Sequence, residues 1–213
     1  MVISNRLVSL IILFLAMTCV AQDEKYRAGE HYEILPQTVR TANPEKIEVN
    51  EIFSYICGHC YNFQSQVHDW SLALPDDVDF QRTHVIWNAD MEAFAKAYYS
   101  AISLGVIDRV HMDIFEAHHL KKQRLRGESD FRDIFVEHGV EASEFNRMFN
   151  SFGIGSMVNQ GKARVRAFRT KGTPEIVVDG KYRITSRLSG SLRGMLDVTG
   201  FLVEKERRAR KAG

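Results

Sequence analysis

Cysteine is scarce in this sequence, with only Cys19, Cys57 and Cys60 among 213 residues. We expect Cys19 to leave with an amino-terminal segment, so that the remaining chain holds a single pair. One pair excludes a small secreted fold that is held together by several disulfides. Because Cys57 and Cys60 are so close in sequence, we expect them to be reactive thiols rather than structural ones.

An excess of charge of either sign is also absent. The chain has 28 Lys and Arg residues against 27 Asp and Glu residues, a formal net charge of +1. Arg6 is the only charged residue in positions 1–21, so removal of this segment leaves a neutral balance. This balance argues against nucleic acid or an anionic membrane surface as the main partner. The sequence contains no internal repeat, and its length fits one domain with an insertion or two small domains.

Long apolar runs are confined to the amino terminus. An apolar core at Leu10–Met17 is followed by small residues, with Cys19 and Ala21 at positions −3 and −1 of a cut before Gln22. This pattern predicts a secretory signal peptide over residues 1–21, and therefore chemistry outside the cytoplasm. One alternative is an uncleaved anchor, although the apolar core is too short to span a bilayer. Lipid attachment at Cys19 is another.

The most informative motif is Cys57-Gly58-His59-Cys60. The preceding run, Lys46–Ile56, is β-branched and aromatic enough to predict a strand, and Tyr61–Leu74 has helical spacing. Cys57 therefore lies at a helix start, where free N–H groups and the helix dipole favour a thiolate. The thiolate is the nucleophile in disulfide exchange, so we expect Cys57 to react with substrate and Cys60 to resolve the mixed disulfide. His59 is placed to stabilise the Cys57 thiolate by a hydrogen bond or by charge.

Other interpretations of these polar residues stay open. The two cysteines could form an inert disulfide, although such a short loop is strained and reducible. They could also bind zinc, which would need two further ligands. His111 and His118 share one face of a predicted helix and are a second candidate metal site, although surface and helix-end histidines are far more common. The basic run Lys121–Arg126 is expected to be a solvated loop, with partner binding as the alternative.

The rest of the pattern predicts an α/β domain that is split in sequence by helices. Glu175–Val178 and Lys181–Ile184 are expected to form a hairpin, because Asp179-Gly180 favours a tight turn. The other expected strands are His31–Leu35, Lys46–Ser54 and Val78–Trp87. The expected helices are Cys57–Leu74, Met91–Leu104, Ile107–Leu120, Glu128–Gly139, Ala142–Arg169 and Leu188–Arg210, the last with an interruption near Gly200.

Together these features resemble the DsbA family of periplasmic thiol:disulfide oxidoreductases, which have a thioredoxin fold. The resemblance is carried by Phe53–Tyr61, Gly172-Thr173-Pro174, Val178–Tyr182 and the helical insertion, and it spans about residues 30–205. It implies a thioredoxin fold made of residues 22–88 and 171–213, with residues 89–170 as an inserted all-helical domain. The implied activity is oxidation of cysteine pairs in unfolded exported proteins, with no cofactor besides the Cys57–Cys60 disulfide. The implied partner is a DsbB-type membrane oxidase linked to quinone, and we expect a monomer.

The resemblance also implies roles for residues outside the motif. Pro174 would have a cis peptide bond facing the dithiol, and Thr173 would offer its backbone to an extended substrate. The simpler alternative is a proline that opens the strand at Glu175. Glu51 would lie buried below the dithiol with Arg82 as its partner, where a carboxylate can tune the site and pass protons to Cys60. A charge on an edge strand is the alternative for Glu51.

One departure from the family is visible in the motif itself. The dipeptide between the cysteines is Gly58-His59, where the best-known members carry Pro-His. Gly-His resembles protein disulfide isomerase, and the intervening pair tunes the redox potential. A disulfide reductase or isomerase that uses the same site is therefore one alternative function. A peptide-binding chaperone with an incidental dithiol is another.

Overall fold

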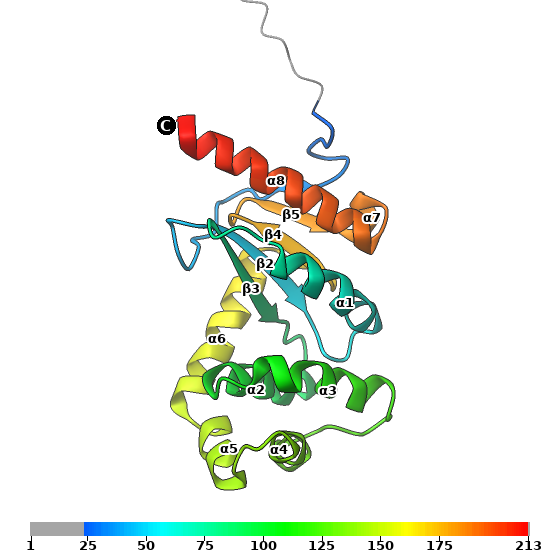
Figure 1. The fold of residues 1–213 in the computed structure, drawn as a ribbon, viewed down its shortest axis with the longest axis vertical. Helices are drawn as coiled ribbons and strands as arrows, with labels where there is room; N and C mark the ends of the chain where they lie inside the picture. The colour runs from blue at the N-terminus through cyan, green and yellow to red at the C-terminus, as the bar shows by residue number, and fades with distance from the viewer. Residues whose placement is uncertain (1–23, 213) are drawn as a thin grey trace, which may run out of the picture.

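The computed structural model describes residues 24–212 of the protein (Figure 1). The predicted signal peptide, residues 1–21, lies outside the described residues, as does Cys19. The described chain contains a five-stranded sheet and eight helices. The helices are α1 (Gly58–Leu72), α2 (Asp90–Ser103), α3 (Ile107–His119), α4 (Glu128–Glu137), α5 (Ala142–Phe149), α6 (Phe152–Ala167), α7 (Ser186–Ser189) and α8 (Leu192–Ala212).

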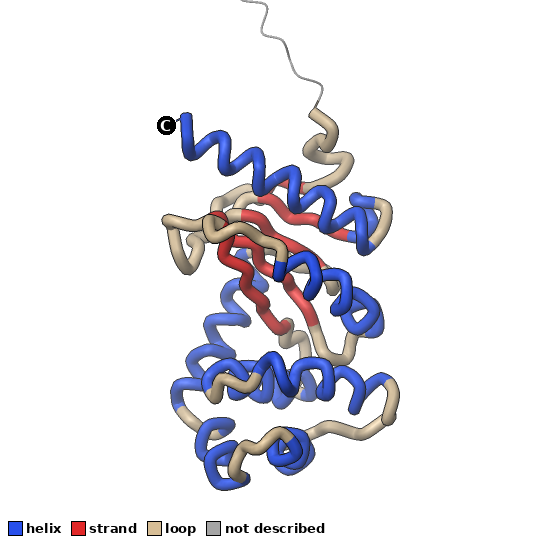
Figure 2. Tube along the Cα trace, viewed as in Figure 1, coloured by secondary structure: helices blue, strands red, loops and turns tan. Residues whose placement is uncertain are grey.

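The sheet is mixed and has its most buried strand in the interior (Figure 2). Its strands are β1 (Glu33–Ile34), β2 (Ile47–Phe53), β3 (Val78–His84), β4 (Glu175–Val178) and β5 (Tyr182–Thr185). They follow the order β1-β5-β4-β2-β3, with β2 parallel to β3 and antiparallel to β4. All seven residues of β2 are buried. The β-branched and aromatic residues that predicted this strand thus contribute to the core on both of its faces.

Helices cover both faces of the sheet. On one face, α1 and α8 pack against β2 and β4 in a cluster that includes Val49, Phe63 and Leu202. On the other face, Val165 of α6 belongs to a cluster with Ile52 of β2. Figure 1 shows α1 and α8 together on one side of the sheet and α6 on the opposite side. The strand that leads to the dithiol is therefore held from both sides.

Helices α2–α5 and the start of α6 form a layer at the end of the sheet where β2 finishes, and the rest of α6 runs from this layer along the sheet (Figure 1). Phe94 of α2 and Phe115 of α3 pack in one cluster with Phe53, Tyr55 and Cys60. The core of the helical layer is therefore continuous with the residues around the dithiol, and burying these aromatic side chains is the main force that fixes the layer to the sheet.

Two helix predictions are wrong. The single helix predicted over Ala142–Arg169 is broken between α5 and α6, because Ser151 takes an extended conformation with φ −69° and ψ 150°. Its hydroxyl accepts a hydrogen bond from the Ile154 N–H at 3.2 Å, which caps a new helix in a new direction. The closing helix predicted from Leu188 is interrupted at Gly190, which has φ 80° between α7 and α8, and not near Gly200, which lies inside α8.

The predicted hairpin turn is confirmed. Asp179 and Gly180 have left-handed φ values of 50° and 61° and are the central residues of a tight turn that is closed by the hydrogen bond from Lys181 N–H to Val178 O at 2.9 Å. Three residues connect Val178 to its partner Tyr182. A Cβ atom on Gly180 would also lie 1.9 Å from the Val39 carbonyl oxygen. Glycine is therefore needed at this position both for its backbone conformation and for close packing.

Two glycines in α6 provide a test of how tightly the helical layer is packed. A Cβ on Gly155 meets nothing within 4 Å, whereas a Cβ on Gly161 would lie 2.3 Å from the Tyr99 hydroxyl of α2. We expect Gly155→Ala to stabilise the protein by about 0.5–1 kcal/mol through helix propensity. Gly161→Ala should destabilise it by about 1–3 kcal/mol through overpacking. Urea unfolding measures both, and a gain in stability from both variants would contradict this account of the α2–α6 contact.

Candidate active site

The two thiols lie at the start of α1, directly after β2. Cys57 is the N-cap residue, with φ −89° and ψ 115°, and the Cys60 N–H donates a hydrogen bond to its sulfur at 3.3 Å. Both cysteines are free, Cys57 is partly exposed and Cys60 is fully buried. The first turn of α1 contains no acidic residue, so nothing in it opposes a negative charge on Cys57. The predicted placement of the dithiol at a strand-to-helix junction is confirmed.

The two thiols have opposite acidities. A hydrogen bond from the Cys60 thiol lowers the pKa of Cys57 to about 5, helped by the Thr173 side chain and by the backbone N–H groups of Cys60 and His59, while burial opposes the shift. Burial raises the pKa of Cys60 far above its ordinary value, and the hydrogen bond to Cys57 and its charge raise it further. At neutral pH the reduced site therefore holds a Cys57 thiolate and a protonated Cys60.

The loop before β4 closes over the dithiol. The Thr173–Pro174 peptide bond is cis, as the resemblance predicts, and β4 begins at the next residue, Glu175. The Cys57 thiol, when protonated, donates a hydrogen bond to the Thr173 carbonyl oxygen at 3.3 Å. The backbone of this loop thus lies within contact distance of the exposed sulfur, although the two segments are 116 residues apart in sequence.

His59 contributes less directly than its position in the motif indicates. Its side chain is exposed, and its imidazole makes no hydrogen bond to another residue of the described chain. The group of His59 that lowers the pKa of Cys57 is its backbone N–H. A role for the imidazole itself stays a prediction.

Glu51 lies buried in the middle of the sheet, with no exposed surface. Its carboxylate accepts hydrogen bonds from Arg82 Nε at 2.8 Å and from Gln64 Nε2 at 2.9 Å. The predicted pair with Arg82 is confirmed, and the edge-strand alternative is wrong because β2 has a neighbour on each side. These two donors satisfy the carboxylate in place of the water that burial removes.

Sequence reasoning missed the residues that connect this carboxylate to the helical layer. Gln64 Nε2 also reaches the Cys60 carbonyl oxygen at 3.3 Å, and Gln64 Oε1 lies 2.9 Å from His111 Nε2. His111 Nδ1 lies 2.8 Å from the Tyr55 hydroxyl. Because the Gln64 amide nitrogen faces the carboxylate, its oxygen must accept, so His111 Nε2 carries the proton and Nδ1 accepts from Tyr55. Burial keeps the pKa of His111 well below its ordinary value, and the Arg82 charge lowers it further.

These contacts also decide the metal hypothesis for the histidines. Both ring nitrogens of His111 are engaged by Gln64 and Tyr55, so the pairing of His111 with His118 at a metal is wrong. Over residues 24–212, no cluster of three or more His, Cys, Asp and Glu side chains is arranged to hold a metal ion. The helical spacing that suggested a shared face gave no sign that His111 points inward.

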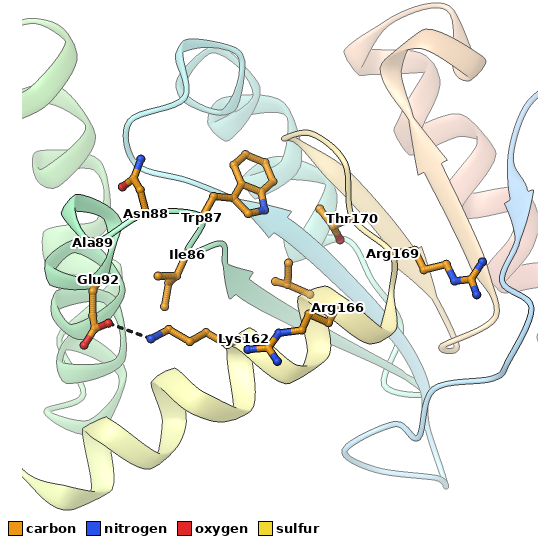
Figure 3. A pocket seen from close by; sticks show the side chains of 10 residues that line it. Ile86, Trp87, Asn88, Ala89, Glu92, Lys162, Arg166, Arg169 and Thr170 are labelled. Atoms are coloured by element: carbon orange, nitrogen blue, oxygen red, sulfur yellow. Dashed lines mark hydrogen bonds and ion pairs between the residues drawn. The ribbon is translucent and has the colours of Figure 1, made fainter.

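A hollow of about 660 Å³ lies between the loop after β3 and α6 (Figure 3). Trp87 stands over it, and Lys162 on its wall forms an ion pair with Glu92 at 2.9 Å. Neither cysteine and no member of the Glu51 network lines it, but Arg169 and Thr170 at its edge belong to the α6–β4 connection that continues into Thr173.

The pKa of Cys57 sets the pH dependence of its reactivity. Because this pKa falls from 9.0 to about 5, alkylation of the reduced protein by iodoacetamide should be nearly constant from pH 9 to 6. It should then fall about tenfold for each pH unit below 5, as the thiolate is protonated. Stabilisation of the reduced fold by this thiolate should likewise disappear as the pH falls from 9 through 5. The pH profile of alkylation measures the pKa, with the urea-unfolded protein as the control, and a midpoint near 8.5 would contradict the assignment.

Comparison with known proteins places the chain in a family. Residues 72–194 match the model of the DSBA-like thioredoxin domain. The chain is 35% identical over 191 residues to the thiol:disulfide interchange protein DsbA of Pseudomonas aeruginosa, covering 90% of each protein. It is 32% identical over 183 residues to DsbA of Azotobacter vinelandii, covering 86% of each.

Solved structures agree with the family model and confirm the predicted fold. The crystal structure of Pseudomonas aeruginosa DsbA matches with a TM-score of 0.85 at 34% identity, covering 89% of this chain and 98% of that one. DsbA from Xylella fastidiosa matches with a TM-score of 0.81 at 32% identity, covering 86% and 98%. With its dithiol at a helix start beside a cis-proline loop, this chain belongs to the DsbA family of thiol:disulfide oxidoreductases with a thioredoxin fold.

Proposed function

We propose that this protein oxidises pairs of cysteines in proteins exported to the periplasm, using the Cys57–Cys60 disulfide as the oxidant. The observation that carries the proposal is the opposite shift of the two thiol pKa values, down for Cys57 and up for Cys60. A stabilised thiolate favours the reduced form of the enzyme, and a favoured reduced form makes its disulfide a strong electron acceptor.

The reaction balances over two exchange steps. A substrate thiolate attacks the Cys57 sulfur of the oxidised enzyme, the Cys57–Cys60 bond breaks, and Cys60 leaves and takes up a proton. A second substrate thiolate then attacks the substrate sulfur of the mixed disulfide, and Cys57 leaves as a thiolate. Two electrons pass from the substrate to the enzyme, and the substrate gains one disulfide. The low pKa of Cys57 makes it a good leaving group in the second step.

The residues around the dithiol support these steps. The Thr173 backbone faces Cys57 and is suited to pair with an extended substrate strand, while Pro174 lies next to it. Gln64 Nε2 donates to both the Glu51 carboxylate and the Cys60 carbonyl, which holds the carboxylate near α1, and by resemblance to the family Glu51 would handle the proton of Cys60. The exposed imidazole of His59 is free to stabilise the Cys57 thiolate or to meet the substrate.

Location and partners follow from the family and from the amino terminus. The signal peptide at residues 1–21 would direct the chain across the inner membrane, with cleavage near Ala21-Gln22. Between residues 24 and 212, the helices are all too short or too polar to be candidate membrane spans. A DsbB-type membrane partner linked to quinone would restore the disulfide. The protein would act as a monomer on unfolded exported chains, without nucleic acid and with no cofactor besides its own disulfide.

The first experiment separates a disulfide donor from a reductase or isomerase. Equilibration of the purified dithiol with a glutathione buffer should give a redox potential above about −150 mV, because the Cys57 thiolate stabilises the reduced form. An isomerase would give a value near about −180 mV, and a reductase a value near or below about −250 mV. A second assay measures the oxidation of a reduced unfolded protein. The Cys57→Ser variant should be inactive in it, whereas a chaperone with an incidental dithiol would keep its activity in that variant.

Glu51→Gln tests the buried carboxylate. Loss of this negative charge leaves Arg82 unbalanced beneath the dithiol, so the pKa of Cys57 should fall and the redox potential should rise. The matched control is Glu48→Gln, because Glu48 is also buried on β2 but pairs with Arg164. Thiolate absorbance as a function of pH measures the pKa in both variants. An unchanged titration in Glu51→Gln, or an equal change in both variants, would show that Glu51 has no specific effect on the pKa of Cys57.

A further inference from the structure

A pocket with a basic rim lies next to Ile56, between the α3–α4 loop and the start of α2. Its volume is about 520 Å³, within the range of ligand-binding clefts. One of its walls is Ile56, the residue immediately before Cys57. We call this site the basic pocket; its lining residues are Ile56, Asp90, Phe94, His118, His119 and Lys122–Arg126.

The basic pocket has apolar walls and a fixed rim. Phe94 and Leu125 are both at least 90% buried, so the Leu125 side chain anchors the loop in the core of the helical layer. The loop backbone is tied to the end of α3 by hydrogen bonds from Lys121 N–H to Glu116 O at 2.9 Å and from Gln123 N–H to Ala117 O at 2.8 Å. The cations on this loop are therefore held near the pocket rather than on a free tail.

Three cations on the rim lack an ion pair, although Arg124 also borders a second hollow that is lined by Asp113, Asp130, Asp133 and Glu137. Lys122, Arg124 and Arg126 are exposed, and none forms an ion pair with a carboxylate of residues 24–212. The only acidic lining residue is Asp90. The pKa of His118 is lowered by burial and then by the charges of His119 and Lys122, which agrees with a positive local potential.

We infer that the basic pocket binds an apolar side chain flanked by carboxylates, presented by the polypeptide whose cysteine reacts with Cys57. This inference rests on the proposed function and names the substrate chemistry that the same site prefers. A single apolar side chain of a polypeptide can enter the pocket and contact its apolar walls. A flat lipid surface would contact only the rim and would leave the pocket unfilled. Opposite charge on the rim would steer such segments to the dithiol and hold them there.

The test uses single-cysteine peptides of one length that differ only around one leucine. The leucine is flanked by Asp, Asn or Lys and placed on either side of the cysteine in turn. Reaction with the oxidised protein is followed in a single turnover. In low salt, the Asp peptide should react about tenfold faster than the Asn peptide, and the Lys peptide should be slowest. The advantage should shrink as salt is added, because these charges are exposed.

A matched pair of triple variants locates the effect. Lys122→Gln/Arg124→Gln/Arg126→Gln should remove most of the preference for the Asp peptide. The control is Arg40→Gln/Arg147→Gln/Arg208→Gln, which removes the same charge at three exposed residues that also lack ion pairs within the described chain. This control should keep the preference. As an independent readout, an Asp peptide without cysteine should raise the pKa of His118 in an NMR titration of the wild-type protein, and the Asn peptide should not.

Three outcomes overturn the inference and are distinguishable. If all peptides react but at equal rates, or if both triple variants lose the preference equally, the basic pocket is not the recognition site and the proposed function stands. If no peptide reduces the protein, the proposed function fails and this inference fails with it. If the pocket variant keeps the preference but loses co-sedimentation with phosphatidylglycerol vesicles, the rim serves a membrane surface instead.

Discussion

The stabilised negative charge on Cys57 is the feature on which the rest of the site depends. It comes from hydrogen bonds donated by the Cys60 thiol, the Thr173 side chain and the backbone N–H groups at the start of α1. The surrounding fold serves to keep these donors in place: β2 delivers the chain to the helix start, and β4 brings the Thr173 loop back to the same point. Burial of Cys60 completes the arrangement by keeping the second proton on the second sulfur.

The helical layer is part of this arrangement rather than an independent addition. Tyr55 packs among Phe53, Phe94 and Phe115, and its carbonyl oxygen accepts a hydrogen bond from His119 Nε2 at 2.8 Å. The His119 ring also stacks on Tyr61, with centroids 5.1 Å apart. His119 of α3 thus contacts Tyr55 before the dithiol and Tyr61 after it. These contacts fix the position of the reactive sulfur relative to the basic pocket.

Local signals in the sequence predict most of the fold and the centre of the site. The strand at β2, the dithiol at a helix start and the Asp179-Gly180 turn each follow from residues that are adjacent in sequence. The contacts of Gln64 and His111 could not be predicted, because they join residues 47 positions apart whose meeting depends on how α3 packs. The break at Ser151 was missed because apolar residues recur at helical spacing on both sides of it, although Ser151, Gly153 and Gly155 are themselves signals of a helix boundary.

The two halves of the site emerge at very different times when the chain is made. Cys57 and Cys60 leave the ribosome first, and Thr173 follows only after the whole helical layer has been synthesised. Until that loop arrives and α1 is folded onto β2, the thiols lack the donors that make Cys57 acidic. The nascent chain therefore carries cysteines whose difference in acidity becomes complete only after Thr173 has joined the site.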